Sequence, residues 1–504
     1  MQVGFVWEKK PRVVWLSSTL TAILVAIASC VTKGGARAWP YVTIAIRVLR
    51  YAAQAAAKST TRFLQIPFQK LHSMNQNWLK KIIAATLMLG LLILALGWWQ
   101  HSALLSSIAG FITMVACCMG MSVPDWSGYR FTFWILIANI GAMLAPQWFQ
   151  NIGEFSLTNS WLMLIVIQAI MFGMGTQMSL RDFAHVVKMP KGVVVGLSCQ
   201  FTIMPLLGVT LAKVFLLPPE VAAGVILIGS CSSGLASNVM TFMAKGNLAL
   251  SVTITAMATV MAPVMTPVWM KLLAGSLVDI NAFKMSMDIV KMVLVPILAA
   301  FVHEWLSSRE LRTRRIVQVL TFLASVWIAF LMLGGWQWMV ANAVRPSESF
   351  QSALSIPGFF AAATLFGFVY HHAVEFVPKL KGWMPIVSMI GIVYYTLVTT
   401  AIGRNQLLEV GFVLVIVTFL HNVLGFFLGY WASRALGMNR QDARTIAIEV
   451  GMQNGAMGAG IARSMGKLDT VGLAATIFGP LMNITGSVLA NHWRQTADDP
   501  EPLK

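Results

Sequence analysis

Long apolar runs constrain this chain more than any other feature. About fifteen runs of roughly 18–25 residues carry few charges, and each is long enough to cross a hydrocarbon core of about 30 Å as a helix. The runs fall at about 13–31, 82–99, 103–123, 131–147, 160–177, 192–215, 221–243, 250–272, 284–303, 316–340, 353–375, 383–402, 408–432, 443–465 and 469–491. Because no water satisfies backbone polar groups inside lipid, such runs predict helices. The sequence therefore predicts an all-α polytopic membrane protein.

The charge balance supports a membrane setting. Only 11% of the residues are charged, whereas soluble domains have about 25%, which argues against a soluble enzyme. The net charge of +18 would suggest nucleic acid for a soluble protein. Here the lysines and arginines lie in loops and beside apolar runs, where they face lipid headgroups. We therefore expect membrane lipid, and no nucleic acid, as a partner.

The N-terminal part is ambiguous, and the rest has a regular charge pattern. Residues 1–31 read as either a signal-type segment or a true span. Residues 33–81 hold nine Lys/Arg and no acidic residue, which favours a cytoplasmic, membrane-hugging segment over an organellar transit peptide. From residue 124 onward, basic residues fall on alternate loops, which predicts a cytoplasmic C-terminus. We expect a multi-pass protein of the cell membrane (the inner membrane if bacterial), with a plastid envelope as the alternative.

Glu449 is an unusual residue for an apolar run. No other charge lies between Arg444 and Arg463, and a carboxylate in lipid costs on the order of 3 kcal/mol. Gln453 and Asn454 follow one turn later, and four glycines at 451, 455, 458 and 460 weaken a regular helix. Irregular backbone at membrane depth is tolerated where it lines a cavity or is buried in protein. The carboxylate, two amides and freed carbonyls together predict a cation site.

A second polar cluster lies in residues 230–255. Ser237 and Asn238 follow Gly234, a plausible helix break, and Ser251 and Thr255 share one helix face by their spacing. Small polar side chains in membrane helices commonly hydrogen-bond between helices, and that reading stays open for any single hydroxyl. For the whole cluster, taken with Glu449, we favour a shared site of oxygen ligands.

The lengths of the two halves predict an internal repeat. Residues 131–277 hold five runs in about 147 residues, and residues 282–494 hold seven in about 213. Removing an extra pair at about 315–380 leaves nearly equal lengths, with the polar break in the fourth run of each half. Because five is odd, the halves begin on opposite sides of the membrane. This pattern is typical of an inverted repeat with a site near the midplane.

Several ordered motifs carry a family resemblance. They are Met171-Phe172-Gly173-Met174-Gly175 before Arg181-Asp182-Phe183, Gln200-Phe201-Thr202-Ile203-Met204-Pro205, Ser237-Asn238-Val239-Met240-Thr241, Ala244-Lys245-Gly246-Asn247 with Leu250-Ser251-Val252, His421-Asn422 with Gly425, and Glu449-Val450-Gly451-Met452-Gln453-Asn454. Over about 131–305 and 383–494 the chain resembles the bile acid:sodium symporter family. The resemblance implies a ten-helix inverted-repeat (5+5) transporter core, with a panel domain, a core domain and two discontinuous helices that cross near the bilayer centre.

The resemblance also implies ligands for two sodium ions, which would be co-substrates. One ion would be held by Ser237, Asn238, Ser251, Thr255 and Glu449. A second would be held by Gln200, Glu449, Val450, Met452 and Gln453, partly through carbonyls. The oxygen-only donors with one acid agree with that expectation. The candidate substrate residues are Gly234, Asn238, Asn454 and Gly455, because freed helix N-termini attract anions.

The chain departs from the family pattern in two ways. The family commonly has Cys-Pro-Gly-Gly before the first break, where this chain has Cys-Ser-Ser-Gly at 231–234. Extra spans also precede residue 124 and interrupt the second half. We interpret His371-His372 in that insert as an interfacial pair beside Glu375 and Lys379, rather than as a proton relay.

These departures set the expected domains. Residues 1–123 form an N-terminal extension with two or three spans and a basic segment, and 124–305 hold the first repeat and the first span of the second. Residues 306–382 are an inserted helical pair, 383–494 complete the second repeat, and 495–504 are a cytoplasmic tail.

The expected function is secondary transport. A sodium-coupled symporter of an organic anion, bile-acid-like or a short keto or carboxylic acid, fits the predicted site. Proton-coupled organic anion transport and a transporter-derived sensor are the alternatives. No paired carboxylates, metal cluster or nucleophile motif indicates an enzyme.

Overall fold

The computed structural model describes residues 76–496, apart from 100–101, 124–125, 127–129, 153, 308–310 and 343–347. The chain separates into two compact units, Met1–Ile82 and Ile83–Lys504, and the second holds nearly all of the described residues. The expected first span at 13–31, nearly all of the basic segment at 33–81 and nearly all of the tail at 495–504 lie outside the described residues.

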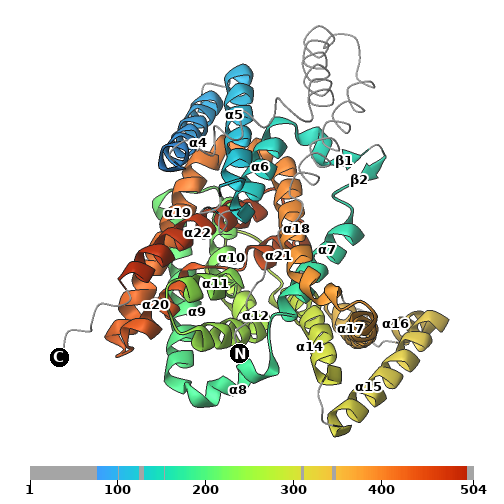
Figure 1. Ribbon diagram of the computed structural model, residues 1–504. Coiled ribbons are helices and arrows are strands. Elements are labelled where there is room, and N and C mark those ends of the chain that lie inside the picture. Colours follow the sequence, from blue (N-terminus) through green and yellow to red (C-terminus); the bar gives the residue numbers. More distant parts are fainter. Residues whose placement is uncertain are drawn as a thin grey trace, which may run out of the picture. The chain divides into compact units, whose positions relative to one another are not determined.

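The core is built of two sets of five spans, shown in Figure 1. The helices of the first set are α6 (Arg130–Leu144), α7 (Ser160–Gly175), α9 (Pro190–Val214), the pair α10 (Pro219–Ser230) and α11 (Ala236–Met243), and α12 (Leu248–Ala274). Those of the second are α13 (Ala282–Ile289) with the π-helical turn η3 (Val290–Leu294) and α14 (Val295–Ser307), then α18 (Lys379–Ile402), α19 (Arg404–Ala435), the pair α20 (Arg440–Gly451) and α21 (Gly455–Ser464), and α22 (Gly472–Gln495).

The remaining described elements connect or extend this core. They are α4 (Gln76–Trp99), α5 (Ala103–Met121), η2 (Pro146–Phe149), the hairpin of β1 (Asn151–Ile152) and β2 (Phe155–Ser156), α8 (Leu180–Lys188), α15 (Leu311–Phe330), η4 (Leu331–Gly335), α16 (Trp336–Ala341) and α17 (Glu348–Phe376). Nine described helices are long and apolar enough to cross a membrane, and three shorter apolar helices accompany them. The protein is therefore an all-α, multi-pass membrane protein.

Packing between helices repeats from one half to the other. α9 contacts α10 as α19 contacts α20, and α11 contacts α12 as α21 contacts α22. α7 contacts α14 as α18 contacts α6, while α10 contacts α22 as α20 contacts α12. Exchanging the halves therefore reproduces the contacts. The expected inverted repeat of five plus five spans is confirmed.

The core divides into two groups of helices. The crossing group consists of α9–α12 and α19–α22, and the flanking group consists of α6, α7, α13–α14 and α18. In Figure 1 the short helices α10, α11 and α21 lie near the centre of the core. Of the two half-helices that follow the breaks, α21 packs on the flanking helices α7, α13 and α18, whereas α11 packs on α12, α20 and α22 within the crossing group.

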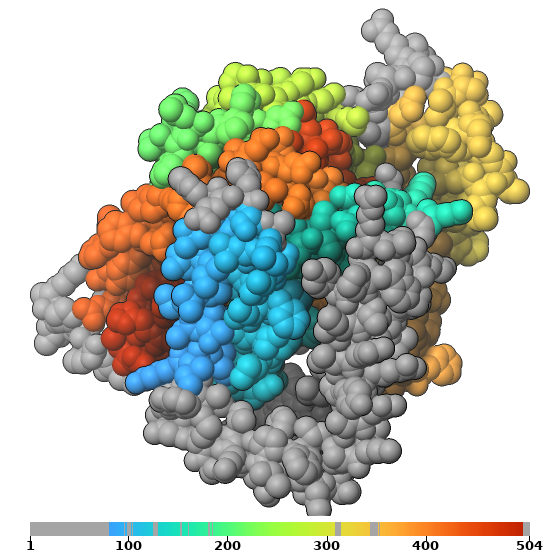
Figure 2. All heavy atoms as spheres, turned by 90° about the horizontal axis from the view of Figure 1, so that it is seen from above, coloured from blue at the N-terminus to red at the C-terminus, as the bar shows by residue number. Residues whose placement is uncertain are grey.

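The inserted helices dock on the flanking group. α17 packs against α14 and α15, and Figure 2 shows α15, coloured yellow, at one edge of the molecule. Large apolar side chains of α15 are exposed, among them Phe322 and Leu323, as lipid-facing side chains are. The first inserted helix is bent, because Gly334 adopts φ +94° and kinks the chain at η4.

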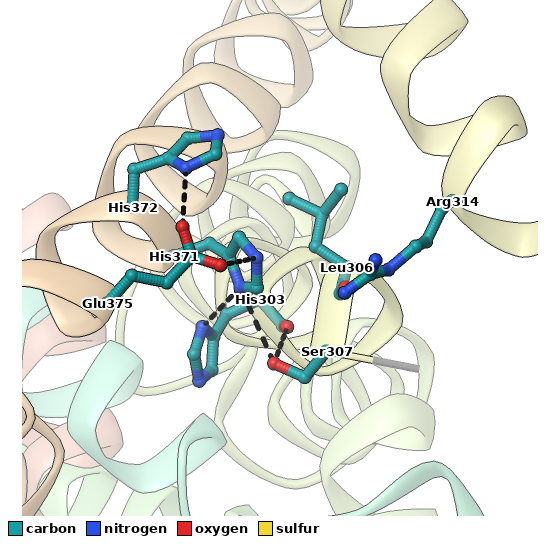
Figure 3. Close-up of polar contacts among 7 residues, drawn as sticks. All are labelled: His303, Leu306, Ser307, Arg314, His371, His372 and Glu375. Atoms are coloured by element: carbon teal, nitrogen blue, oxygen red, sulfur yellow. Dashed lines mark hydrogen bonds and ion pairs between the residues drawn. The ribbon is translucent and has the colours of Figure 1, made fainter. Parts of the chain in front are cut away.

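A histidine cluster fastens α17 to α14, as Figure 3 shows. The Nδ1 atoms of His371 and His303 are 3.2 Å apart, and the other ring nitrogen of His371 lies 3.5 Å from Glu375. His372 Nδ1 is 2.9 Å from the same carboxylate. Both histidines therefore lie beside Glu375, as expected, and the choice of an interfacial pair beside Glu375 and Lys379 over a proton relay stays a prediction.

Candidate functional site

The two broken helices meet through their backbones. The N–H of Gly234 donates to the carbonyl of Met452 at 3.3 Å, and the N–H of Asn454 donates to the carbonyl of Ser232 at 2.8 Å. Exchanging the two halves of the core maps each of these bonds onto the other. The crossing therefore lies on the local two-fold axis of the repeat. Both helices are interrupted there, yet these backbone groups remain paired.

Between these two hydrogen bonds, the two interrupted segments at 232–234 and 452–454 run antiparallel. Ser233 and Gln453 form an isolated β-bridge, which supports a repeat of inverted topology. Gly234 permits the close approach, because a Cβ atom there would lie 3.2 Å from the carbonyl oxygen of Gln453. The break thus forms without the proline found in the resembling family.

Glu449 lies in a cage of hydroxyl groups. Its side chain is fully buried, in the last turn of α20. Four hydroxyls donate to it: Ser237 at 2.6 Å and Ser251 at 2.5 Å to Oε1, and Ser233 at 2.6 Å and Thr255 at 2.8 Å to Oε2. Among the described residues no lysine or arginine pairs with this carboxylate. Its only polar partners there are neutral oxygens.

Asn238 completes the cage. Its Oδ1 lies 2.8 Å from the hydroxyl oxygen of Ser251 and 3.4 Å from that of Thr255, whose single hydrogens are directed at Glu449. The structure therefore brings together all five residues of the first expected cation site, with oxygen atoms from α11, α12 and α20. Hydroxyl, amide and carboxylate oxygens are the donors that hard cations take.

Gln200 is at the centre of the second expected set. Its Nε2 donates to the carbonyl of Cys231 at 3.0 Å and to Gln453 Oε1 at 2.8 Å, and Gln453 Nε2 donates to the carbonyl of Val450 at 2.6 Å. The Oε1 of Gln200 is buried and has no hydrogen-bond partner among the described residues. A buried acceptor without a donor is unfavourable, and a cation would satisfy it.

In the second expected cation site, some oxygen atoms are free to bind an ion and others already accept hydrogen bonds. Met452 and Gln453 are fully buried and follow Glu449 by three and four residues along the chain. The carbonyls of Met452 and Val450 each accept a hydrogen bond already, so each keeps one lone pair for an ion. Among the described residues no group of three His, Cys, Asp or Glu could hold a metal ion.

A cavity of about 130 Å³ adjoins the crossing. Its walls come from α6, α7, α11, α18, α21 and α22, with Gly234, Gln453, Asn454 and Gly455 at the break. Asn454 caps α21, because its Oδ1 accepts from the N–H of Met457 at 3.0 Å. Three expected substrate residues thus line this cavity. Asn238, the fourth, is not among its lining residues and lies in the cage instead.

Ser233 and Tyr395 are among the polar residues of this region that were not singled out from the sequence. Ser233 donates to Glu449, and Tyr395 of α18 lines the cavity. The signal for Ser233 was present, because a hydroxyl beside a helix break next to a buried acid is a natural donor. Tyr395 carried no such signal, since a single tyrosine in a span is ordinary.

Comparisons with known proteins agree with this geometry. The model of the Sodium Bile acid symporter family matches residues 163–342. An uncharacterized sodium-dependent transporter of Bacillus subtilis, YocS, is 32% identical over 74% of this chain and 92% of its own length. A probable sodium/metabolite cotransporter of Arabidopsis thaliana chloroplasts, BASS1, is 29% identical over 73% of this chain and 74% of its own length. The human ileal sodium/bile acid cotransporter is 26% identical over 61% of this chain and 69% of its own length.

Proposed function

The chain belongs to the sodium bile acid symporter family, and from that premise we propose that it moves an organic anion together with sodium by alternating access. Because it belongs to this family, it is a sodium-dependent transporter rather than an enzyme. The substrate, the number of ions and the transport cycle are proposals. Their main support is the neutral oxygen cage around Glu449, which leaves the carboxylate's charge free to pair with a bound cation.

The proposed cation sites share Glu449. The first ion is held by Ser237, Asn238, Ser251, Thr255 and Glu449. The second is held by Gln200, Glu449, Val450, Met452 and Gln453. Entry of the second ion is favoured by the unpaired Oε1 of Gln200. If two sodium ions enter with one monovalent anion, one net charge moves inward, and the membrane potential adds about 2.3 kcal/mol per 100 mV.

The proposed cycle moves the crossing group against the flanking group. In this structure α21 contacts α7, α13 and α18, whereas α11 keeps to its own group. With the topology predicted from the basic loops, α21 runs toward the outside and α11 toward the cytoplasm. The outer half is then closed, and the cavity faces the cytoplasm. The opposite state releases α21 from the flanking helices and docks α11 there, as the repeat symmetry allows.

The experiment is uptake of ²²Na⁺ and of a mixture of ¹⁴C-labelled short carboxylates into proteoliposomes. We expect anion uptake to require an inward sodium gradient and to increase with an inside-negative potential. Glu449→Ala should abolish it while the protein still purifies as a monodisperse species, because no other described acid lies in the cage. Uptake by this variant at the wild-type rate would remove the mechanism.

The same vesicles separate the alternatives. A proton-coupled transporter takes up the anion in sodium-free buffer when a pH gradient is imposed. A sensor binds the anion, seen as a thermal shift, but moves none of it. The oxygen-only donors around Glu449 favour sodium over both outcomes.

A further inference from the structure

Polar side chains continue from the cage of Glu449 toward the cytoplasmic ends of three helices. Each helix that supplies a cage residue carries a second polar side chain one turn away, and residues four apart share one helix face. These side chains are Thr445 on α20, Thr241 on α11 and Asn247 at the N-cap of α12, each four residues from Glu449, Ser237 or Ser251. With the topology predicted from the basic loops, all three lie on the cytoplasmic side of the cage.

The three side chains lie close together. The helices α11, α12 and α20 contact one another, and the N–H of Asn247 donates to Thr445 Oγ1 at 2.8 Å. A Cβ atom on Gly246 would lie 2.8 Å from Cγ2 of Thr241 and 2.8 Å from Thr445 Oγ1, which places both threonines next to this glycine. Both are fully buried, as the cage is. The three helices thus enclose one polar path.

Asp442 lies at the cytoplasmic end of this path. Its Oδ1 accepts a hydrogen bond from Asn247 Nδ2 at 2.8 Å. Asp442 is half-buried, whereas Thr445, one turn further along α20, is fully buried. A carboxylate therefore stands at each end of the path, Glu449 inside the protein and Asp442 toward its surface, with neutral oxygen atoms between them.

One hydroxyl on the path has no partner. Thr241 Oγ1 is buried and makes no hydrogen bond to any described residue, although a threonine in a helix is able to donate to the carbonyl four residues back. A buried polar group without a partner is unfavourable. A cation that passes between the three helices would bind this oxygen, because hard cations take oxygen ligands.

The matching positions of the other half are apolar. The pair Ser233 and Gln453 sets the correspondence for the broken helices, and the N-caps of α12 and α22 set it for those two helices. Thr445 then matches Val225, Thr241 matches Ile461, Asp442 matches Ala222 and Asn247 matches Val471. Because apolar side chains pack well at the same places in one half, packing alone does not explain polar ones in the other.

We propose that sodium leaves Glu449 for the cytoplasm along this path, between α11, α12 and α20 within the crossing group. The inference rests on the proposed function and adds the route of the ion. The ion passes from the cage to Thr445 and Thr241, and then to Asp442 as Asn247 releases that carboxylate. Ion and substrate thereby reach the cytoplasm by different routes, since the cavity lies between the crossing and flanking groups.

The test compares cysteines at matched positions of the two halves. Thr445→Cys and Thr241→Cys lie on the path, and Val225→Cys and Ile461→Cys lie on its apolar counterpart. All four native side chains are fully buried, so exposure in the closed structure does not distinguish them. Each variant is made in the full chain without its native cysteines and placed in lipid nanodiscs, which leave both faces open to reagents.

The probes are two small methanethiosulfonates, the cationic 2-aminoethyl and the anionic 2-sulfonatoethyl compound, with each rate divided by that for a free thiol. We expect the cation to modify the two path cysteines at least about tenfold faster than the anion, because Glu449 and Asp442 concentrate cations between them. NaCl in place of choline chloride should slow the reaction, because bound sodium screens Glu449. The two counterpart cysteines should react with neither compound.

Three results would overturn the route. They are no reaction at the path cysteines, equal relative rates for the two compounds there, and labelling of Val225→Cys and Ile461→Cys as fast as of the path positions. Thr241→Cys replaces a hydroxyl that has no partner, so it should fold and carry the test even if Thr445→Cys, which alters the acceptor of Asn247, does not.

The function on which the route rests is judged by a separate measurement. Sodium should raise the melting temperature of the cysteine-free parent relative to choline. If it does not, the cotransport proposal fails. If sodium stabilises the parent and the path cysteines do not react, the route is wrong and the cotransport proposal stands.

Discussion

The two broken helices of the core share a backbone geometry and differ in charge. Ser233 and Gln453 occupy matching positions on the two-fold axis. Glu449 lies four residues before Gln453, and the residue four before Ser233 is Gly229. A Cβ atom on Gly229 would lie 2.5 Å from the carbonyl of Met204. The first helix therefore has no room for any side chain where the second carries its carboxylate.

Helices α9 and α19 differ in a similar way beside the crossing. Gln200 Nε2 donates to the carbonyl of Cys231 at 3.0 Å, and Asn422 Nδ2 donates to the carbonyl of Gly451, the matching position, at 2.7 Å. Asn422 Oδ1 accepts from Thr485, whereas Gln200 Oε1 is unpaired. The repeat thus supplies one scaffold twice, but the buried carboxylate of Glu449 and the unpaired amide oxygen of Gln200 each occur in only one of the two halves.

The largest effect is expected from a substitution that removes the charge of Glu449 and keeps the shape of its side chain. Glu449→Gln keeps the volume and one acceptor oxygen. We expect the apparent affinity for sodium, measured by thermal shift, to fall by about 100-fold or more, because a buried ion loses its only anionic partner. Stability in sodium-free buffer should not fall. Glu375→Gln, at an exposed carboxylate of α17, is the control. A sodium response that survives Glu449→Gln would place the ion elsewhere.

The next test sets Gln200 against Asn422. Gln200→Leu removes the unpaired oxygen, so the apparent sodium affinity should fall by about tenfold. It also leaves the carbonyl of Cys231 without its donor, so it should lose stability as Asn422→Leu does. Asn422→Leu leaves the carbonyl of Gly451 unpaired and should cost roughly 1–3 kcal/mol of stability, with sodium affinity within about twofold of wild type. Equal losses of sodium affinity in the two variants would mean that the halves contribute alike.

Some of this asymmetry can be predicted from the sequence. A single acid in a long apolar run, followed by two amides and flanked by glycines, indicates a buried site because burial of a lone charge is costly. The hydroxyls at 237, 251 and 255 follow from their spacing. The inverted repeat follows from run lengths and from an odd number of spans. Each of these signals comes from residues that are close in the sequence, or from the lengths and number of the apolar runs.

Other features depend on the packing of distant segments. The pairing of Gly451 with Asn422 joins two helices, and nothing in either helix alone indicates it. The unpaired hydroxyl of Tyr395 is a property of the walls around it, since several helices must be placed before its partner is seen to be missing. The docking of His371 on His303 is likewise set by the path of the insert. For such residues the sequence gives the side chain but not its surroundings.

A smaller effect is expected where α21 meets the flanking group. A Cβ atom on Gly460 would lie 2.1 Å from Cδ1 of Ile167 on α7, so Gly460→Val displaces that side chain and disturbs the contact between α21 and α7. Overpacking of this kind costs about 1–3 kcal/mol, which should open the outer half and increase outside access to the cavity about fivefold or more. Labelling of Ala459→Cys by an impermeant maleimide, in a background without the native cysteines, measures that access.

The control for this test lies on the other half-helix. Met240→Val on α11 alters packing within the crossing group, because α11 makes its contacts there, and it should leave outside labelling unchanged. Slower labelling after Gly460→Val would contradict the outward closure by α21.

The smallest expected effect concerns Ser233, whose hydroxyl the matching Gln453 lacks. Ser233→Gly removes one of four donors to Glu449. The ion-free carboxylate depends on these donors more than the ion-bound one does, so losing about 1 kcal/mol from the ion-free state should raise apparent sodium affinity a few-fold. Ser232→Gly is the control, because that hydroxyl contacts Met457 Sδ at 3.7 Å instead. A fall in sodium affinity after Ser233→Gly would show that the serine oxygen is itself an ion ligand. The first broken helix, which has no carboxylate, would then still contribute directly to ion binding.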